Sequence, residues 1–415
     1  MRFMGRHRLI VGCGIIVVSG LFWLPHLAGA WMQTGGEPFQ GVANDFMDGK
    51  LPYRDRLLEY PPYSIPIFLL PRLLFGKDNY LGGFTLLVFL ADCVVKVLLL
   101  HFGLRASKTA RALLPVLAYS VGTPFLQDFF LLRYDIWPAL ICLLAIWLAC
   151  SNRHFLCGLA IAAGIGVKVY PVVLVAPLFV LALRQTKATR FAAGLAAGLF
   201  PIAILSFVLP WWRFAQFQGA RGLQVESLYA ALLWTAEQLG LAQVTWEWDT
   251  SWFEVHGPLA AAVLPCAQVV FLATAGTSAI LAGLAAARCE NVTTARVARL
   301  LLMPLLGFVV FNLVFSPQFM IWLLSIAALG AVEENPWPML AVLLATLLTP
   351  IFYPCPEYNR GLNFYETMAL LYRNLLLLYV FVWLIRDLLR PGASQTFCLE
   401  GPMQQTMPTD ESSLG

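Results

Sequence analysis

Charge is scarce in this sequence. Asp, Glu, Lys and Arg together make up 12% of its 415 residues, whereas apolar residues make up 60%. A soluble domain carries about twice that charged fraction. The composition therefore excludes a soluble globular protein and predicts an integral membrane protein with many spans. The net charge of +4, without any long basic run, does not indicate nucleic-acid binding. We therefore interpret the basic residues as topology signals and site residues.

Several common site motifs are also missing. The chain has nine cysteines but no Cys-x-x-Cys pair, and six of the nine lie within apolar segments. Cysteines in apolar segments typically act as small packing residues, not as metal ligands. The chain also lacks a glycine-rich loop of the nucleotide-binding type and any soluble domain. The sequence therefore predicts no cofactor, either metal or nucleotide.

Apolar segments recur along nearly the whole chain. The length that crosses a bilayer as a helix is about 20 residues. On that basis we predict a single all-α polytopic membrane domain over 1–390 and a disordered cytoplasmic tail over 391–415. We expect the first segment to be an uncleaved span, although it resembles a signal peptide. The twelve predicted spans are 9–28, 79–103, 111–123, 136–150, 155–167, 171–184, 191–210, 257–287, 299–315, 318–331, 337–352 and 366–386.

The segment 64–75 decides the topology. Its 12 residues reach about 18 Å as a helix, well short of the roughly 30 Å hydrocarbon core. Lys and Arg accumulate in cytoplasmic loops. If 64–75 does not cross, 16 of the 27 basic residues lie inside, among them the cluster over 105–111. We therefore predict both termini inside, a juxtamembrane helix at 64–75, and long outer loops at 29–63 and 211–256.

The densest polar cluster follows the first span. Residues 49–55 read Gly-Lys-Leu-Pro-Tyr-Arg-Asp, and residues 59–62 read Glu-Tyr-Pro-Pro. Polar residues gathered at the membrane surface of so apolar a chain indicate a site instead of packing. The candidate substrate-binding residues here are Arg54, Asp55, Glu59 and Tyr60.

Two cations stand beside apolar segments. Arg133 precedes a predicted span, and Lys168 lies in a predicted outer hairpin. A charge near hydrocarbon costs a few kcal/mol unless it is paired or used. One interpretation is that both side chains snorkel to the interface; the other is that they bind a lipid-linked phosphate at the outer leaflet. Asp92 and Lys96 lie one helical turn apart within a span, and we interpret them as an ion pair outside the site.

The order of these motifs resembles a known family. The two motifs of the first outer loop are followed by Arg-Tyr-Asp-x-x-Pro at 133–138 and Val-Lys-Val-Tyr-Pro at 167–171. Further on come Arg-Gly-Leu-Gln-Val-Glu-Ser-Leu at 221–228, Ser-Pro-Gln-Phe at 316–319 and Arg-Asn-Leu-Leu-Leu at 373–377. The set is similar to bacterial type C glycosyltransferases, and most similar to the polyprenyl-phosphate-mannose-dependent alpha-mannosyltransferase-like family. Each motif is short, but their order over 35–378 is specific for the family.

The resemblance implies a plasma-membrane (inner-membrane) enzyme whose active site faces outward. It would transfer a sugar, expected to be mannose, from a polyprenyl-phosphate carrier to a glycan or glycolipid acceptor, with inversion at the anomeric carbon. The expected partners are this donor, the acceptor and membrane lipids, without nucleic acid. Beyond the first outer loop, the substrate-binding residues that the resemblance implies are Arg133, Asp135, Lys168, Tyr170, Arg221 and Gln318.

The catalytic base is the point at which this chain departs from the family. In the resembling sequences an aspartate 17 residues before the Pro-Tyr pair takes the acceptor proton, and counting back from Pro52 gives Gly35. The nearest carboxylate is Glu37, which we predict as the base, with Asp45 as the alternative. The missing aspartate leaves open a non-catalytic homologue that binds a lipid-linked sugar. A polyprenyl-linked glycan transporter is a third alternative, although the polar groups gather at one face and no matching broken helices are evident.

Overall fold

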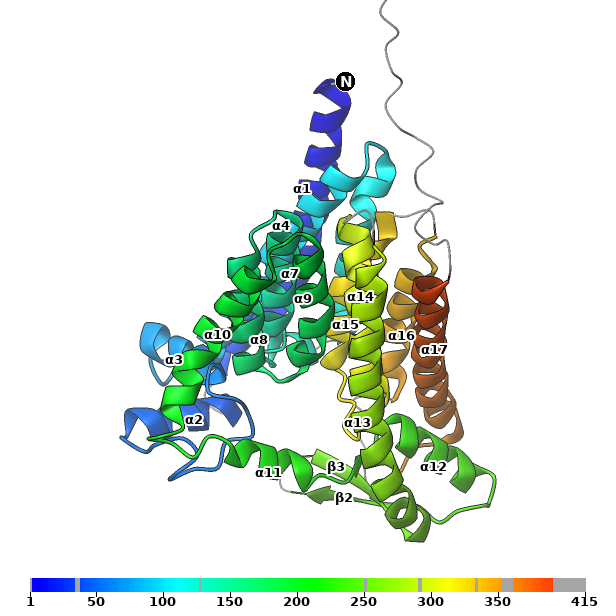
Figure 1. Ribbon diagram of the computed structural model, residues 1–415. Helices are drawn as coiled ribbons and strands as arrows, with labels where there is room; N and C mark the ends of the chain where they lie inside the picture. The colour runs from blue at the N-terminus through cyan, green and yellow to red at the C-terminus, as the bar shows by residue number, and fades with distance from the viewer. Residues whose placement is uncertain are drawn as a thin grey trace, which may run out of the picture.

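The computed structural model describes residues 2–33, 38–126, 128–249, 252–289, 293–332, 335–352 and 361–390. Nearly all of its regular structure is helical, which confirms the all-α prediction (Figure 1). The predicted tail over 391–415 lies outside the described residues.

Each of the twelve predicted spans coincides with a helix or with two consecutive helices. Among the described residues, five helices, α1, α4, α10, α13 and α17, are long and apolar enough to cross a membrane, by length and composition. The other described apolar helices are 10–17 residues long. The helices therefore support a membrane protein, while the count of twelve spans stays a prediction. The twelve segments are α1 (Arg2–Met32), α4 (Tyr80–Ala106), η1 (Ala110–Leu113) with α5 (Leu114–Gly122), α7 (Ile136–Cys150), α8 (His154–Val167), η3 (Tyr170–Leu174) with α9 (Val175–Arg184), α10 (Ala188–Leu205), α13 (Pro258–Ala287), α14 (Thr294–Val310), α15 (Phe319–Leu329), α16 (Trp337–Phe352) and α17 (Phe364–Leu389).

The helix α15 forms the centre of the bundle. Every residue of α15 is buried, as expected of a helix that is apolar on all sides and surrounded by other helices. In contrast, only 11% of the most apolar window of α1 is buried. Exposed apolar side chains on α1 fit contact with lipid, where the helix satisfies its own backbone hydrogen bonds.

Glycine sets the close approach of α8 to α10. A Cβ atom at Gly158 would lie 2.1 Å from the carbonyl oxygen of Phe191, and one at Gly194 would lie 1.9 Å from that of Phe155. No larger residue fits at either position without moving backbone. Small residues of this kind let helices pack closely where lipid provides no hydrophobic driving force.

Shorter elements gather at the end of the bundle opposite the N-terminus (Figure 1). The predicted juxtamembrane helix is present with the expected bounds as α3 (Ser64–Phe75). A small antiparallel sheet has the strand order β1-β3-β2. The remaining elements of this end are α2 (Pro38–Met47), η2 (Thr123–Leu126), α6 (Asp128–Leu131), α11 (Arg213–Gly219), β1 (Leu223–Gln224), α12 (Leu228–Gln238), β2 (Thr245–Asp249) and β3 (Trp252–His256). The short helix η4 (Gly330–Val332) instead follows α15 at the other end of the bundle.

Candidate functional site

Two helix ends bring together an ion pair. Asp135 is the N-cap residue of α7, and Lys168 directly follows the last residue of α8. The helix macrodipole favours an anion at a helix N-terminus and a cation at a C-terminus. The ammonium nitrogen of Lys168 lies 2.5 Å from Asp135 Oδ1. The structure therefore joins two predicted site residues directly.

Four aromatic rings surround this lysine. The distances from Lys168 Nζ to the ring centroids are 4.7 Å for Tyr134, 5.0 Å for Trp322, 5.6 Å for Phe319 and 5.9 Å for Tyr60. Aromatic faces attract a cation, and more strongly when water is excluded. We call Lys168, Asp135 and the four rings the Lys168 cage. Its residues come from the loop between α2 and α3, the start of α7, the end of α8 and the start of α15.

Most of the cage is rigidly packed. The ring of Trp322 is stacked between those of Tyr170 and Phe319, with both centroid distances 4.1 Å. The predicted site residue Tyr170 thus contributes by holding Trp322 in place. Tyr134 packs against Phe39 and Phe68 at 5.5 and 5.1 Å between ring centroids.

The end of α8 is also fixed to the loop between α2 and α3. The backbone N–H of Tyr63 donates to the carbonyl of Gly166 at 2.8 Å. A Cβ atom at Gly166 would lie 2.2 Å from the Tyr63 ring, so this contact requires glycine. The close approach positions Lys168, two residues further on, beside Tyr60.

Arg133 has a different environment from Lys168. Its guanidinium carbon lies 5.8 Å from the Phe129 ring centroid, and no ion pair with a described carboxylate is present. Burial, and after it the Glu59 carboxylate, raise the pKa of Tyr60 well above its usual value, while Arg133 and Arg221 oppose this shift. Arg133 therefore acts electrostatically on the cage without being neutralised there.

The segment between α10 and α12 contacts the loop between α2 and α3 beside the cage. Arg221 Nη2 forms a hydrogen-bonded ion pair with the Glu59 carboxylate. Gln218 Nε2 donates to the carbonyl of Glu59 at 3.1 Å, and Arg213 Nη1 donates to that of Tyr53 at 3.3 Å. The predicted residues Glu59 and Arg221 are thus brought together, and they hold α11 against the loop that carries Tyr60.

Three other predicted residues make mainly local contacts. Arg54 is exposed and lies 3.6 Å from Asp55, whose carboxylate also accepts the N–H of Leu51 at 2.8 Å. Gln318 Oε1 accepts the hydroxyl of Ser316 at 2.5 Å, immediately before Phe319 of the cage. The structure thus places Gln318 next to the cage, while Arg54 and Asp55 form a surface turn.

The two predicted bases are Glu37 and Asp45. Glu37 lies outside the described residues. The carboxylate of Asp45 accepts hydrogen bonds from Lys50 at 2.8 Å and from Arg56 at 2.5 Å, and these two bonds lower the pKa of Asp45. A carboxylate stabilised in its ionised form is a weak base. Asp45 therefore acts as a base only if these pairs open.

Sequence reasoning missed a second buried cation. Arg373 on α17 is fully buried, and its guanidinium lies 3.9 Å and 4.7 Å from the rings of Phe315 and Phe352. Its Nη2 donates to the carbonyl of Glu226 at 2.5 Å. The Arg-Asn motif at 373–374 was visible in the sequence. Its position in the middle of a helix, however, gave no reason to assign Arg373 to a site. Arg373 thus fixes the turn between β1 and α12.

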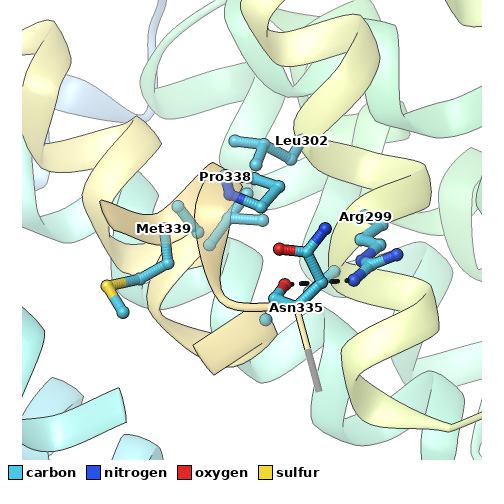
Figure 2. Close-up of a pocket in the computed structure, with 9 residues that line it drawn as sticks. Arg299, Leu302, Asn335, Pro338 and Met339 are labelled. Carbon is cyan, nitrogen blue, oxygen red and sulfur yellow. Dashed lines mark hydrogen bonds between the residues drawn. The ribbon is translucent and has the colours of Figure 1, made fainter. Parts of the chain in front are cut away.

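A small pocket lies at the other end of α15 (Figure 2). Its lining includes Arg299, Leu302, Asn335, Pro338 and Met339, and Arg299 Nη2 donates to the carbonyl of Asn335 at 3.4 Å. The same guanidinium pairs with Asp387 on α17 at 2.9 Å. This pocket is thus bordered by a structural ion pair between helices. No cluster of metal-ligand side chains occurs over the described ranges.

The family model for glycosyltransferase family 87 matches residues 58–317, which is more than half of the chain. The matched region contains Glu59, Arg133, Asp135, Lys168 and Arg221, and it ends just before the part of the cage that α15 provides. No curated protein matches the chain.

Proposed function

The chain belongs to glycosyltransferase family 87, and we propose that it transfers a sugar, mannose in the first instance, from a polyprenyl-phosphate carrier to a glycan or glycolipid acceptor. Family membership gives the coarser function, that of a membrane glycosyltransferase. The observation that supports the donor class is the Lys168 cage with Arg133 beside it. Two cations at helix ends, in surroundings of low dielectric, suit a lipid-linked phosphate.

In the proposed reaction the cations stabilise the leaving group. The acceptor hydroxyl oxygen attacks the anomeric carbon, the bond from that carbon to the phosphate oxygen breaks, and the configuration inverts. The polyprenyl phosphate leaves as an anion, so it needs positive charge more than it needs a proton. Arg133, which no described carboxylate neutralises, and Lys168 supply that charge from a preorganised, water-poor site.

The acceptor proton passes to a carboxylate of the first outer loop. We propose Glu37, because it stands beside the position where the family aspartate is replaced by Gly35. The helix α2 begins at Pro38, as expected for a proline in the first turn, so a helix start directly follows Glu37. Asp45 is the alternative base, and it must first release Lys50 and Arg56.

We propose that the cage faces outward from the plasma membrane, with both termini inside. The charge distribution supports this orientation, because the basic cluster over 105–111 then lies in the cytoplasm. An impermeant thiol reagent applied to intact cells tests it, with single cysteines at Ala106 and Gly240. Labelling is expected at 240 and not at 106, and the reverse pattern would overturn the orientation.

The transfer itself is tested with radiolabelled polyprenyl-phosphate mannose in membranes with and without the protein. Label should move to a membrane acceptor only when the protein is present, and Glu37→Gln should lower turnover about a hundredfold or more while donor binding survives. If Glu37→Gln is active and Asp45→Asn is not, the base is Asp45. If the protein transfers no sugar from any polyprenyl-linked donor, the absent family aspartate favours the second candidate, a non-catalytic protein that binds lipid-linked sugars.

A further inference from the structure

Three polar atoms of the Lys168 cage are buried without a hydrogen-bond partner among the described residues. They are Asp135 Oδ2, the hydroxyl of Tyr134 and the indole Nε1 of Trp322. The three side chains are at most 1% exposed. Buried polar groups are nearly always hydrogen-bonded in native proteins, so three exceptions around one lysine require an explanation.

The chemistry of the three atoms restricts which ligand satisfies them. A carboxylate oxygen accepts hydrogen bonds, an indole N–H only donates, and a phenol hydroxyl does both. A phosphate carries acceptors only and would repel Asp135, and a polyprenyl tail offers neither donors nor acceptors. A polyhydroxyl ligand matches all three, because every sugar hydroxyl both donates and accepts.

We propose that Asp135, Tyr134 and Trp322 form the subsite that binds the sugar ring of the donor and selects among sugars. Asp135 then bridges the two parts of the donor: Oδ1 holds Lys168, which faces the phosphate, and Oδ2 accepts a hydrogen bond from a sugar hydroxyl. This inference rests on the proposed function, and it adds the residues that determine which sugar is used.

The cage is least enclosed at Tyr60. The ring of Tyr60 is half-buried, whereas the other three rings are buried. Tyr60 belongs to the loop that the Glu59–Arg221 ion pair holds in place. Its ring makes tilted or edge contacts with Phe39, Phe68 and Tyr134, whereas the ring of Trp322 is stacked on both sides. Displacement of Tyr60 admits a sugar while the three atoms that bind it stay in position.

Deoxy-sugar donors test the subsite directly. The full-length protein in detergent is assayed for binding of polyprenyl-phosphate mannose, of its analogues that each lack one ring hydroxyl, and of polyprenyl phosphate without a sugar. Tyr134→Phe and Trp322→Phe should each weaken binding of the mannose donor about fivefold, and Asp135→Asn about 10- to 100-fold. For each variant there should be one analogue that it binds as tightly as the unaltered protein does. That analogue lacks the hydroxyl that the altered side chain contacts.

Matched controls separate recognition from packing. Tyr119→Phe on α5 and Trp234→Phe on α12 alter buried aromatic residues outside the cage. They should leave the pattern across the analogues as in the unaltered protein. Tyr134→Phe and Trp322→Phe should also leave binding of bare polyprenyl phosphate unchanged.

Two results would overturn the subsite. One is a uniform loss of affinity for all donors, including bare polyprenyl phosphate, which is the pattern of a packing role. The other is unchanged affinity of all three variants for the mannose donor and for the glucose, galactose and arabinose donors. The proposed function fails by a different result: the unaltered protein binds lipid-linked sugars with this selectivity but releases no glycosylated product.

Discussion

Among the described residues, two lysine–aspartate pairs lie in apolar surroundings, and they are alike in distance but not in setting. Lys96 Nζ lies 2.6 Å from Asp92 within α4, and Lys168 Nζ lies 2.5 Å from Asp135 between α8 and α7. Both side chains of the first pair are fully buried, whereas that of Lys168 is 14% exposed. The distance within an ion pair therefore says little about its role.

The surroundings separate the two pairs. Lys96 and Asp92 are one turn apart on one helix, so the pair forms wherever α4 forms. Lys168 and Asp135 are 33 residues apart and meet only when two helix ends and the loop that carries Tyr60 have packed. The second pair also lies next to an unneutralised Arg133 and opens toward Tyr60. A charge pair that depends on tertiary structure, beside the half-buried ring of Tyr60, is suited to exchange partners with a ligand.

The largest expected effect comes from removing one charge of the Asp92–Lys96 pair, which we call the inner pair. Lys96→Met leaves Asp92 buried without its counter-ion, and such changes cost about 3–5 kcal/mol of folding free energy. Transfer per folded molecule should stay near the level of the unaltered protein. Chemical unfolding in detergent, with activity normalised to folded protein, measures both. A loss of activity at unchanged stability would erase the distinction between the two pairs.

Changing the cage should reverse that pattern. Lys168→Gln and Arg133→Gln should each lower transfer about a hundredfold, because a charged hydrogen bond of roughly 3 kcal/mol to the phosphate is lost in the transition state. Initial rates of radiolabel transfer at matched membrane insertion give the comparison. Unchanged rates would return both cations to a role at the membrane interface.

The sequence predicted helices and local pairs well because both depend on short spacings. The bounds of Ser64–Phe75 and the Asp92–Lys96 pair follow from apolar run length and from i,i+4 geometry. The motifs also identified Lys168 and Asp135 separately. Their partnership depends on the mutual packing of α7 and α8, which no spacing along the chain encodes.

Other parts of the site carry signals that are ambiguous in sequence. Tyr134 and Trp322 look like ordinary core aromatics in apolar segments, and only their place around Lys168 singles them out. The Arg373 side chain is stabilised by a backbone carbonyl 147 residues away. Contacts of this kind have no signature in residue type, because any residue supplies the carbonyl.

A moderate effect is expected at the Glu59–Arg221 ion pair, which holds the loop that carries Tyr60. Arg221→Gln removes one charge of a part-buried pair with Glu59 and should lower transfer about five- to tenfold, since one such contact contributes roughly 1–1.5 kcal/mol. The reversed pair, Glu59→Arg with Arg221→Glu, should recover part of the rate if the pair only positions the loop. A reversed pair as inactive as the single variants would instead place one of these charges on the substrate.

The smallest effect on stability is expected when both members of the inner pair are replaced. Asp92→Leu with Lys96→Met removes two desolvated charges together, and buried pairs replaced by apolar residues of similar size usually leave stability unchanged or higher. The double variant should therefore unfold near the unaltered protein, well above Lys96→Met alone, and should transfer sugar normally. The same double change at Asp135 and Lys168 should abolish transfer, because Lys168 has no apolar substitute when a phosphate binds. If the Asp92 and Lys96 double variant is as unstable as Lys96→Met, the inner pair has further partners, such as Tyr119 on α5, and its role extends beyond neutralising itself.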